Sequence, residues 1–284
     1  MAVRIITDST ADFFGSAKER CLVVPLTVHF GDQEYVDGVT IDYKTFYEKL
    51  VECDTLPTTS QATPAAFEDV YAQVAAAGDT AVVITVSAEL SGTWQSAMIA
   101  AEDYQGRIFV VDSRSVAIGI GVLAELALQL ADRGMDAHGI AEEISRQREN
   151  VRVVALLDTL EYLKRGGRIS KTIAFAGNML SIKPVAAIRD GKIALLGKAR
   201  GSRQGNNLLV QEIQKAGGVD FDKPLLLGYT GLSDVLLQKY VQDSKALWEN
   251  GTDHLRTTPI GSVIGTHAGP GAVAVAFFSK NDQT

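Results

Sequence analysis

The stretch TAVVITVSAELSGTWQSAMIAAEDYQGRIFVVD, residues 80–112, contains two apolar runs that flank a segment with helical spacing. The runs TAVVITVS and RIFVVD predict strands, because each is rich in β-branched and aliphatic residues. Between them, apolar residues recur on one face of a helix: Trp94, Ala97, Met98 and Ala101. A strand, a helix and a second strand in this order join parallel neighbours in a sheet. The stretch therefore predicts a parallel sheet with helices on both faces.

The same alternation continues on both sides of this stretch through the first 150 residues. VRIITD, residues 3–8, predicts another strand, and Thr63 followed by Pro64 predicts a helix start with threonine as the N-cap. Helices are predicted over residues 43–52, 65–78, 116–132 and 136–149. We therefore expect residues 1–150 to form an N-terminal α/β domain with a mostly parallel sheet between helices.

Residues 151–284 show a different pattern, because antiparallel pairing enters. Asp190-Gly191 is a strong hairpin signal between the apolar runs of residues 183–199. Further strands are predicted over residues 151–158 and 223–230, and two more within residues 262–279 around a Gly/Pro turn. Helices are predicted over residues 159–167, 171–180, 202–218 and 233–251. This pattern predicts a second α/β domain with a mixed or antiparallel sheet and helices.

Composition narrows the function classes. The 284 residues carry a net charge of −7, which argues against general nucleic-acid binding. Residues 160–203 nevertheless hold ten Lys and Arg against two acidic residues, so this segment is either a solvated face or an attractor for an anionic ligand or an acidic partner protein. Cys21 and Cys53 lack metal-type spacing, and neither a signal peptide nor a 20-residue apolar span is evident. A cytoplasmic location is expected.

Hydroxyl-rich segments follow several predicted strands. They are TDSTAD (residues 7–12), SAELSGTW (87–94) and DSRS (112–115), and PTTSQ (57–61) precedes the helix that Thr63 opens. Ligands of parallel α/β sheets bind beyond the carboxyl ends of the strands, where hydroxyl and backbone N–H groups can hold an anion. Each segment taken singly is also explained by helix capping. Their number favours a shared anion pocket.

Three roles for Ser91 remain open from the residues alone: a nucleophile, a ligand-binding hydroxyl or a helix cap. The sequence contains neither the G-x-S-x-G turn of serine hydrolases nor the G-x-x-x-x-G-K-[ST] phosphate loop. His267, in THAGPG, is the histidine best placed to donate to an anion. No cluster of carboxylates, Cys or His suggests a metal. We therefore expect a binding protein without a cofactor, with a small-molecule kinase or a serine hydrolase using Ser91 as the alternative.

Six motifs occur in the order found in the DegV family, which this chain resembles over nearly its whole length. They are TDSTADF (7–13), PTTSQATPAAF (57–67), SAELSGTWQSA (87–97), VVDSRSVAIGIG (110–121), LEYLKRGGRISKTIAFAGNMLSIKPVAAIRDGKI (160–193) and IGTHAGPGAVAV (264–275). The resemblance implies a bacterial fatty-acid-binding protein with one fatty acid between two α/β domains. It also implies a separate ATP-dependent fatty-acid kinase subunit, to which the carboxylate is presented and from which the acyl-phosphate is carried away.

The resemblance also assigns candidate site residues. Thr59 and Ser91, with Ser60 and Gly92 beside them, match the family's carboxylate-binding segments, and His267 matches its head-group histidine. Basic residues near the head group are typical of the family, and the candidates here are Arg168 and Arg200. Ala62 departs from the family pattern, which usually has proline there.

The acyl tail requires an apolar wall. The residues expected to line it, which ordinary core packing would equally explain, are Ile173, Phe175, Met179, Leu180 and Ile182. A lipid carrier must also load at a bilayer, so transient membrane contact with a local opening is expected. A regulatory protein that uses bound lipid as a signal is a further hypothesis.

Overall fold

The computed structural model describes residues 2–169, 182–249, 251–252 and 255–280. Its first sheet has four parallel strands in the order β2-β1-β6-β7. They are β1 (Val3–Asp8), β2 (Cys21–Val24), β6 (Thr80–Thr85) and β7 (Ile108–Asp112). The crossover predicted from residues 80–112 is confirmed, with α4 (Thr93–Ala101) and the short 3-10 helix η1 (Glu102–Tyr104) between β6 and β7.

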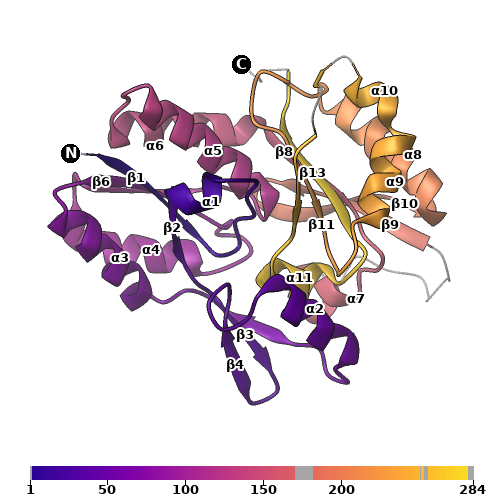
Figure 1. Ribbon diagram of the computed structural model, residues 1–284, viewed down its shortest axis with the longest axis horizontal. Helices are drawn as coiled ribbons and strands as arrows, with labels where there is room; N and C mark the ends of the chain where they lie inside the picture. The colour runs from indigo at the N-terminus through magenta and orange to yellow at the C-terminus, as the bar shows by residue number, and fades with distance from the viewer. Residues whose placement is uncertain (1, 170–181, 250, 253–254, 281–284) are drawn as a thin grey trace.

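Helices cover both faces of this sheet (Figure 1). One face carries α3 (Pro64–Ala76) and α4, and the other carries α5 (Ile118–Asp132) and α6 (Ala137–Gln147), while α1 (Ala17–Arg20) precedes the edge strand. Thr63 caps α3 as predicted, since its side chain accepts a hydrogen bond from the Ala66 N–H. Alternate strand residues enter different cores, Ile84 on the α5 side and Val83 on the α3 side. Both faces of the strands are therefore apolar.

The second sheet has six strands in the order β10-β9-β8-β13-β11-β12. They are β8 (Val151–Leu156), β9 (Ile182–Arg189), β10 (Lys192–Arg200), β11 (Leu226–Tyr229), β12 (Thr257–Pro259) and β13 (Val273–Phe278). All neighbours are antiparallel except β11 and β12, so the predicted mixed sheet is confirmed. Asp190 and Gly191 form the predicted turn with φ of 49° and 75°, as a type I′ hairpin requires.

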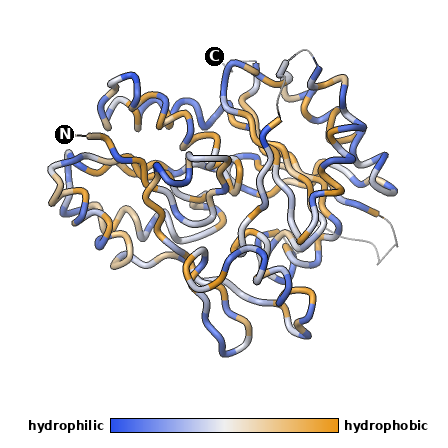
Figure 2. The backbone as a smooth tube through the Cα atoms, viewed as in Figure 1, coloured by the Kyte–Doolittle hydropathy of each residue, from blue (hydrophilic) through white to orange (hydrophobic). Residues whose placement is uncertain are grey.

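One helix lies between the two sheets. α5 contacts β1 and β6 on one side and β8, β11 and β13 on the other, whereas α8 (Gly201–Lys215) and α9 (Val235–Asp243) cover the outer face of the second sheet. Figure 2 shows that β8, β11 and β13 run through mainly hydrophobic residues. Because α5 is apolar all round, it is suited to burial between two sheets. Of its two charged residues, Glu125 is paired with Arg256, and Asp132 at its last position is paired with Arg20.

A small third sheet was not predicted. Its antiparallel strands, in the order β4-β3-β5, are β3 (Thr27–Phe30), β4 (Gln33–Val36) and β5 (Thr58–Ser60), and α2 (Tyr43–Glu52) follows β4. Each strand has three or four residues, which is too short for a clear alternation of apolar and polar positions. The strands β3 and β4 of this sheet lie below the other two sheets in Figure 1. The third strand, β5, carries Thr59, whose Oγ1 atom is 2.9 Å from His267 Nε2 in the second half of the chain.

Two predicted elements were wrong. The first of the strands expected within residues 262–279 is instead the helix α11 (Ser262–Ala268), in which Thr266 Oγ1 donates to the Ser262 carbonyl. Its start is fixed by a distant contact, because Asp12 accepts a hydrogen bond from the Gly261 N–H at 2.9 Å. The helix expected over residues 233–251 breaks at Ser244 into α9 and α10 (Lys245–Trp248).

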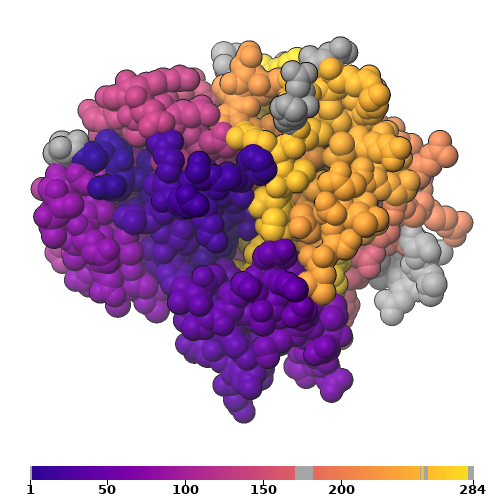
Figure 3. Space-filling model, in the orientation of Figure 1, coloured from indigo at the N-terminus to yellow at the C-terminus, as the bar shows by residue number. Residues whose placement is uncertain are grey.

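The remaining short elements are α7 (Glu161–Arg165) and the 3-10 helix η2 (Arg148–Asn150), which follows α6. No helix within the described ranges is long and apolar enough to cross a membrane. The strands of the first and third sheets all precede residue 150, and those of the second sheet all follow it. The two parts pack broadly against each other (Figure 3), and their division into domains at residue 150 stays a prediction.

Candidate functional site

A cavity of about 400 Å³ lies where the two halves of the chain meet. The first half contributes the loop after β1, strand β5 and the loop from Val86 to Gly92. The second half contributes β8, β9, α11 and β13. The polar residues of the lining are Thr10, Thr59, Ser60, Gln61, Ser91, Arg168, Thr230 and His267. The rest is mostly aliphatic, so the cavity combines a hydroxyl-rich and cationic part with an apolar part.

His267 stands on the last turn of α11, with its Nε2 atom 2.9 Å from Thr59 Oγ1. Burial, with a smaller contribution from the nearby Arg168 charge, lowers its pKa to about 4. The imidazole is therefore neutral at pH 7, with one donor and one acceptor nitrogen. Its Nδ1 atom is buried without a hydrogen-bond partner among the described residues. Nδ1 faces Gly166, where an added Cβ would lie only 2.3 Å away.

Ser91 lies in the loop that precedes α4. Its Oγ atom is 2.9 Å from Thr93 Oγ1 and accepts a long hydrogen bond, 3.3 Å, from the Thr93 N–H. At the neighbouring Gly92, an added Cβ would be 2.1 Å from Gln61 Oε1, so a side chain there would require the Gln61 amide to move. Ser91 thus supports the helix start and lines the cavity at the same time. No hydrogen bond between described residues joins Ser91 to His267, so the pair lacks the contact that a nucleophile and its base require.

Arg168 brings a positive charge to the cavity wall. Its Nε atom donates to the Leu90 carbonyl at 3.2 Å, and Nη1 donates to the Gly166 carbonyl at 2.6 Å. No carboxylate of the described residues forms an ion pair with it. A guanidinium fixed by backbone carbonyls but lacking an acidic partner is available to an anion in the cavity.

Buried Asp8 holds two segments of the cavity wall in place. Its Oδ1 atom accepts the Thr10 N–H at 2.9 Å, and its Oδ2 atom accepts the Val86 N–H at 2.6 Å. Burial raises the pKa of Asp8, and these hydrogen bonds oppose the rise. The TDSTAD segment is therefore mainly a support for the site, although Thr10 itself lines it.

The apolar part of the cavity is built from small and branched side chains. Alanines at positions 155, 186, 272 and 274 lie on or next to the central strands, and Val263 and Ile264 come from α11. Small side chains on a sheet leave a channel above the backbone that a flexible aliphatic chain can fill. Sequence reasoning missed these residues, because alanine in a strand does not differ in pattern from ordinary core.

The candidate residues divide into three groups by position. Six line the cavity: Thr59, Ser60, Ser91, Gly92, Arg168 and His267. Arg200 and Ile182 do not line the cavity. They are paired opposite each other at the open end of the β9–β10 hairpin, away from its turn. Ile173, Phe175, Met179 and Leu180 lie outside the described residues. Gln61 was not predicted, although it belongs to the same PTTSQ segment.

Family membership follows from comparison with known proteins. The family model described as "Uncharacterised protein, DegV family" matches residues 2–280. The chain belongs to the DegV family. A DegV domain-containing protein of Caldanaerobacter subterraneus subsp. tengcongensis is 32% identical over 283 residues, which cover 98% of this chain and 99% of the relative. The motif order that the sequence displays is therefore that of its family.

Solved structures of the DegV family share the fold. A fatty-acid-binding DegV family protein from Thermus thermophilus superposes with a TM-score of 0.87 at 29% identity, covering 98% of this chain and all of that one. The fatty acid kinase (Fak) B3 protein of Streptococcus pneumoniae, loaded with linoleic acid, gives a TM-score of 0.86 over 98% of this chain and 99% of its own. At 23% identity the second likeness shows the fold alone. The described residues of this DegV chain contain no group of three or more side chains suited to a metal ion.

Proposed function

We propose that this chain binds a long-chain fatty acid in the cavity between its two halves. The observation that carries the proposal is the polarity of that cavity. One part has hydroxyls and the Arg168 guanidinium, which forms no ion pair with the described carboxylates, and aliphatic side chains line the rest. The carboxylate would accept hydrogen bonds from Thr59, Ser91 and Arg168. The Thermus thermophilus relative, a fatty-acid-binding protein with this fold, supports the same ligand class.

Most of the affinity would come from the tail. A dozen buried methylene groups contribute about 10 kcal/mol at about 0.8 kcal/mol each, before the cost of ordering the chain. Charge-assisted hydrogen bonds to the carboxylate add about 1.5–3 kcal/mol each before desolvation. The polar residues would therefore fix the position of the head group, while the aliphatic channel would select the tail.

Filling the aliphatic channel with a larger side chain tests this proposal. Ala186→Leu inserts three carbon atoms beside the cavity, so titration with palmitate should show binding weakened at least tenfold. Ala72→Leu, at an exposed position of α3 that does not line the cavity, is the matched control. Palmitate binding that is equally strong in all three proteins would refute the proposed ligand site.

We further propose that the bound carboxylate is presented to a separate ATP-dependent kinase and that the chain carries the acyl-phosphate away. The motif resemblance supports this role.

The basic segment of residues 160–203 is a candidate docking face for the kinase, and Lys164 in α7 is exposed on it. Lys171, the other lysine proposed for docking, lies outside the described residues. Lys164→Glu should weaken acyl-phosphate formation by an added kinase while palmitate binding is unchanged; equal rates would count against this docking face.

A further inference from the structure

A second cavity, of about 430 Å³, lies beside the start of β8 and the β9–β10 turn. The carboxyl-terminal half of α8 forms one wall through Glu212, Lys215 and Ala216. Val153, Ala187 and Ile188 line both this cavity and the first one, so parts of two strands separate the two spaces. None of the polar residues proposed for the fatty-acid head group lines this second cavity.

Two arginines of neighbouring strands line this cavity, Arg152 of β8 and Arg189 of β9. The antiparallel β8–β9 ladder ends with Val154 opposite Ala187, and each arginine lies two residues beyond that pair on its own strand. Like charges that lie close together on neighbouring strands repel each other. Burial lowers the pKa of Arg152, the nearby Glu149 raises it, and the Arg189 charge lowers it again. Within the described ranges, neither arginine has a carboxylate in ion-pair contact.

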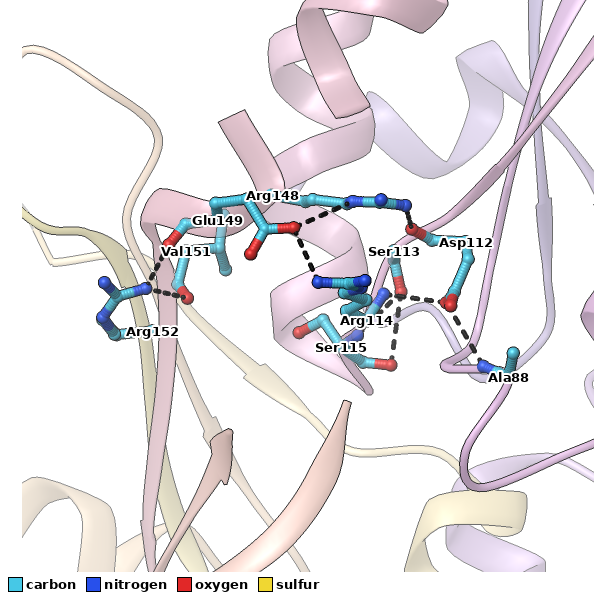
Figure 4. A network of polar contacts seen from close by, with 9 residues as sticks. All are labelled: Ala88, Asp112, Ser113, Arg114, Ser115, Arg148, Glu149, Val151 and Arg152. Carbon is cyan, nitrogen blue, oxygen red and sulfur yellow. Dashed lines mark hydrogen bonds and ion pairs between the residues drawn. The ribbon is translucent and has the colours of Figure 1, made fainter. Parts of the chain in front are cut away.

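A second pair of arginines shares one carboxylate (Figure 4). Arg114 Nη1 and Arg148 Nε both contact the Oε1 atom of Glu149, at 3.0 and 3.3 Å. The Arg114 backbone is held at a φ of 49°, in the left-handed region, by its N–H donating to Asp112 Oδ1 at 2.9 Å. Arg148 is fixed as well, because its Nη1 donates to the Asp112 carbonyl at 2.6 Å. Both guanidiniums are thus oriented before any ligand arrives.

The charges around the cavity do not balance. Five basic side chains line it: Arg114, Arg148, Arg152, Arg189 and Lys215. The three acidic ones are Glu149, Asp190 and Glu212, of which Glu212 is already bonded to Lys215 at 2.7 Å. This local excess of positive charge occurs in a chain whose net charge is −7. Aliphatic side chains of valine, alanine, isoleucine and leucine also line the cavity, together with Gly191 and Ser279, so it offers some apolar surface.

We propose that this second cavity is a binding site for a phosphate group carried by a small ligand, with Arg152 and Arg189 as its principal contacts. Two guanidiniums can each give two parallel hydrogen bonds to phosphate oxygens, a geometry that lysine cannot reproduce. A doubly charged anion between them would attract both guanidiniums and offset the repulsion between them. The apolar lining would accept the body of a phosphomonoester. The phosphate group can come from a free metabolite or from a lipid head group, and the two sources are distinguishable.

Calorimetric titration at low ionic strength tests this site with AMP as the soluble probe. Vesicles containing phosphatidic acid, whose head group is a phosphomonoester, with pure phosphatidylcholine vesicles for comparison, test the head-group source by co-sedimentation. The wild type is expected to bind one AMP per chain, or to bind the vesicles that contain phosphatidic acid selectively. The Arg152→Gln/Arg189→Gln variant should weaken whichever interaction is present at least tenfold. The Arg133→Gln/Lys44→Gln variant removes the same charge from exposed positions outside the cavity and should bind as the wild type does.

Thermal unfolding without any anion separates a binding role from a structural one. Arg152→Gln also removes the hydrogen bonds from Arg152 Nη1 to the Glu149 and Val151 carbonyls, at 2.5 and 3.1 Å. The repulsion is therefore measured with Arg189→Gln alone, which should melt at the same temperature as the wild type or higher, while palmitate binding persists. Three outcomes would overturn the proposal: no binding of either probe at millimolar concentration, an equal loss in both double variants, or a lower melting temperature of Arg189→Gln.

Discussion

The protonation state of His267 is central to the chemistry of the cavity. Its imidazole is neutral because burial lowers its pKa, and its Nε2 atom lies against Thr59. A neutral histidine beside Arg168 avoids placing two positive charges together in the empty cavity. A bound carboxylate would favour the imidazolium form, so ligand binding and proton uptake at His267 are expected to be linked.

The pH dependence of stability tests the state of His267. An unfolded histidine titrates near 6.5, whereas the folded protein holds the His267 pKa at about 4. Protons therefore bind the unfolded chain more readily between these values, and the contribution is complete above pH 6.5 and lost as the pH falls towards 4. Compared with His267→Gln, the wild type should lose at most about 3 kcal/mol more between pH 7 and pH 4. Denaturant unfolding at both pH values measures the difference, and parallel curves would contradict it.

Substitutions can test whether Ser91 and Thr59 bind the ligand or have only a structural role. Ser91→Ala and Thr59→Val each remove one hydroxyl that we propose contacts the carboxylate, so palmitate affinity should fall by about 1–2 kcal/mol. Ser91→Ala should also cost under about 1 kcal/mol of stability, since its contact with the Thr93 N–H is long. Titration and thermal unfolding measure the two effects. An unchanged affinity combined with a large loss of stability would identify Ser91 as only a helix cap.

A substitution at Gly166 tests how closely the site is packed around His267. A Cβ at this position would lie 2.3 Å from His267 Nδ1, so Gly166→Ala should displace the imidazole and weaken palmitate binding about tenfold. The same substitution in a His267→Ala background should cost much less, because the clashing ring is gone. Equal losses in both backgrounds would place the effect in the backbone rather than in the ring.

At the scale of elements, helix α11 links the site to a buried acidic cluster. Its start is held by Asp12 through the Gly261 N–H and by Asp37 through the Ser262 hydroxyl, and its last turn carries His267. Burial raises the Asp12 pKa well above its ordinary value. The Asp12 Oδ2 atom has no partner among the described residues, which suits a carboxyl that keeps its proton.

A neutral isostere should therefore replace Asp12 at little cost. Asp12→Asn keeps the acceptor for Gly261 and should change the free energy of unfolding at pH 7 by under about 1 kcal/mol. Asp12→Ala leaves that N–H without its acceptor and should cost about 1–3 kcal/mol. Chemical denaturation of the two variants measures this difference. A loss with Asp12→Asn as large as with Asp12→Ala would show that the charged form is needed.

The elements that could be predicted are those whose signal is local. β1, β6, α3 and the β9–β10 hairpin follow from apolar runs, a threonine–proline start and an Asp-Gly turn. α11 could not be predicted in this way, because its small residues fit a strand equally well and its start depends on Asp12, about 250 positions earlier. The three strands of the small sheet are too short for periodicity. Thr59 and Ser91 were identified through family motifs, whereas the alanine-lined channel needed three-dimensional contacts.

At the scale of the whole molecule, the cavity is built jointly by both halves of the chain. Between the halves, Ser87 Oγ donates to the Gly191 carbonyl at 2.8 Å, and Lys192 pairs with Glu89 at 3.2 Å. A ligand that contacts both halves should stabilise the folded chain as a unit. Palmitate at one hundred times its dissociation constant should add about 2.7 kcal/mol to the free energy of unfolding. A melting temperature that is independent of palmitate would contradict this expectation.

The central claim is that the joint cavity holds one fatty acid. Native mass spectrometry of the purified chain, followed by release and identification of whatever it carries, tests this claim most directly. We predict one fatty acid per chain, or uptake of one palmitate when the empty protein is titrated, and a reduced occupancy in Ala186→Leu. An empty protein that takes up no fatty acid would contradict the claim.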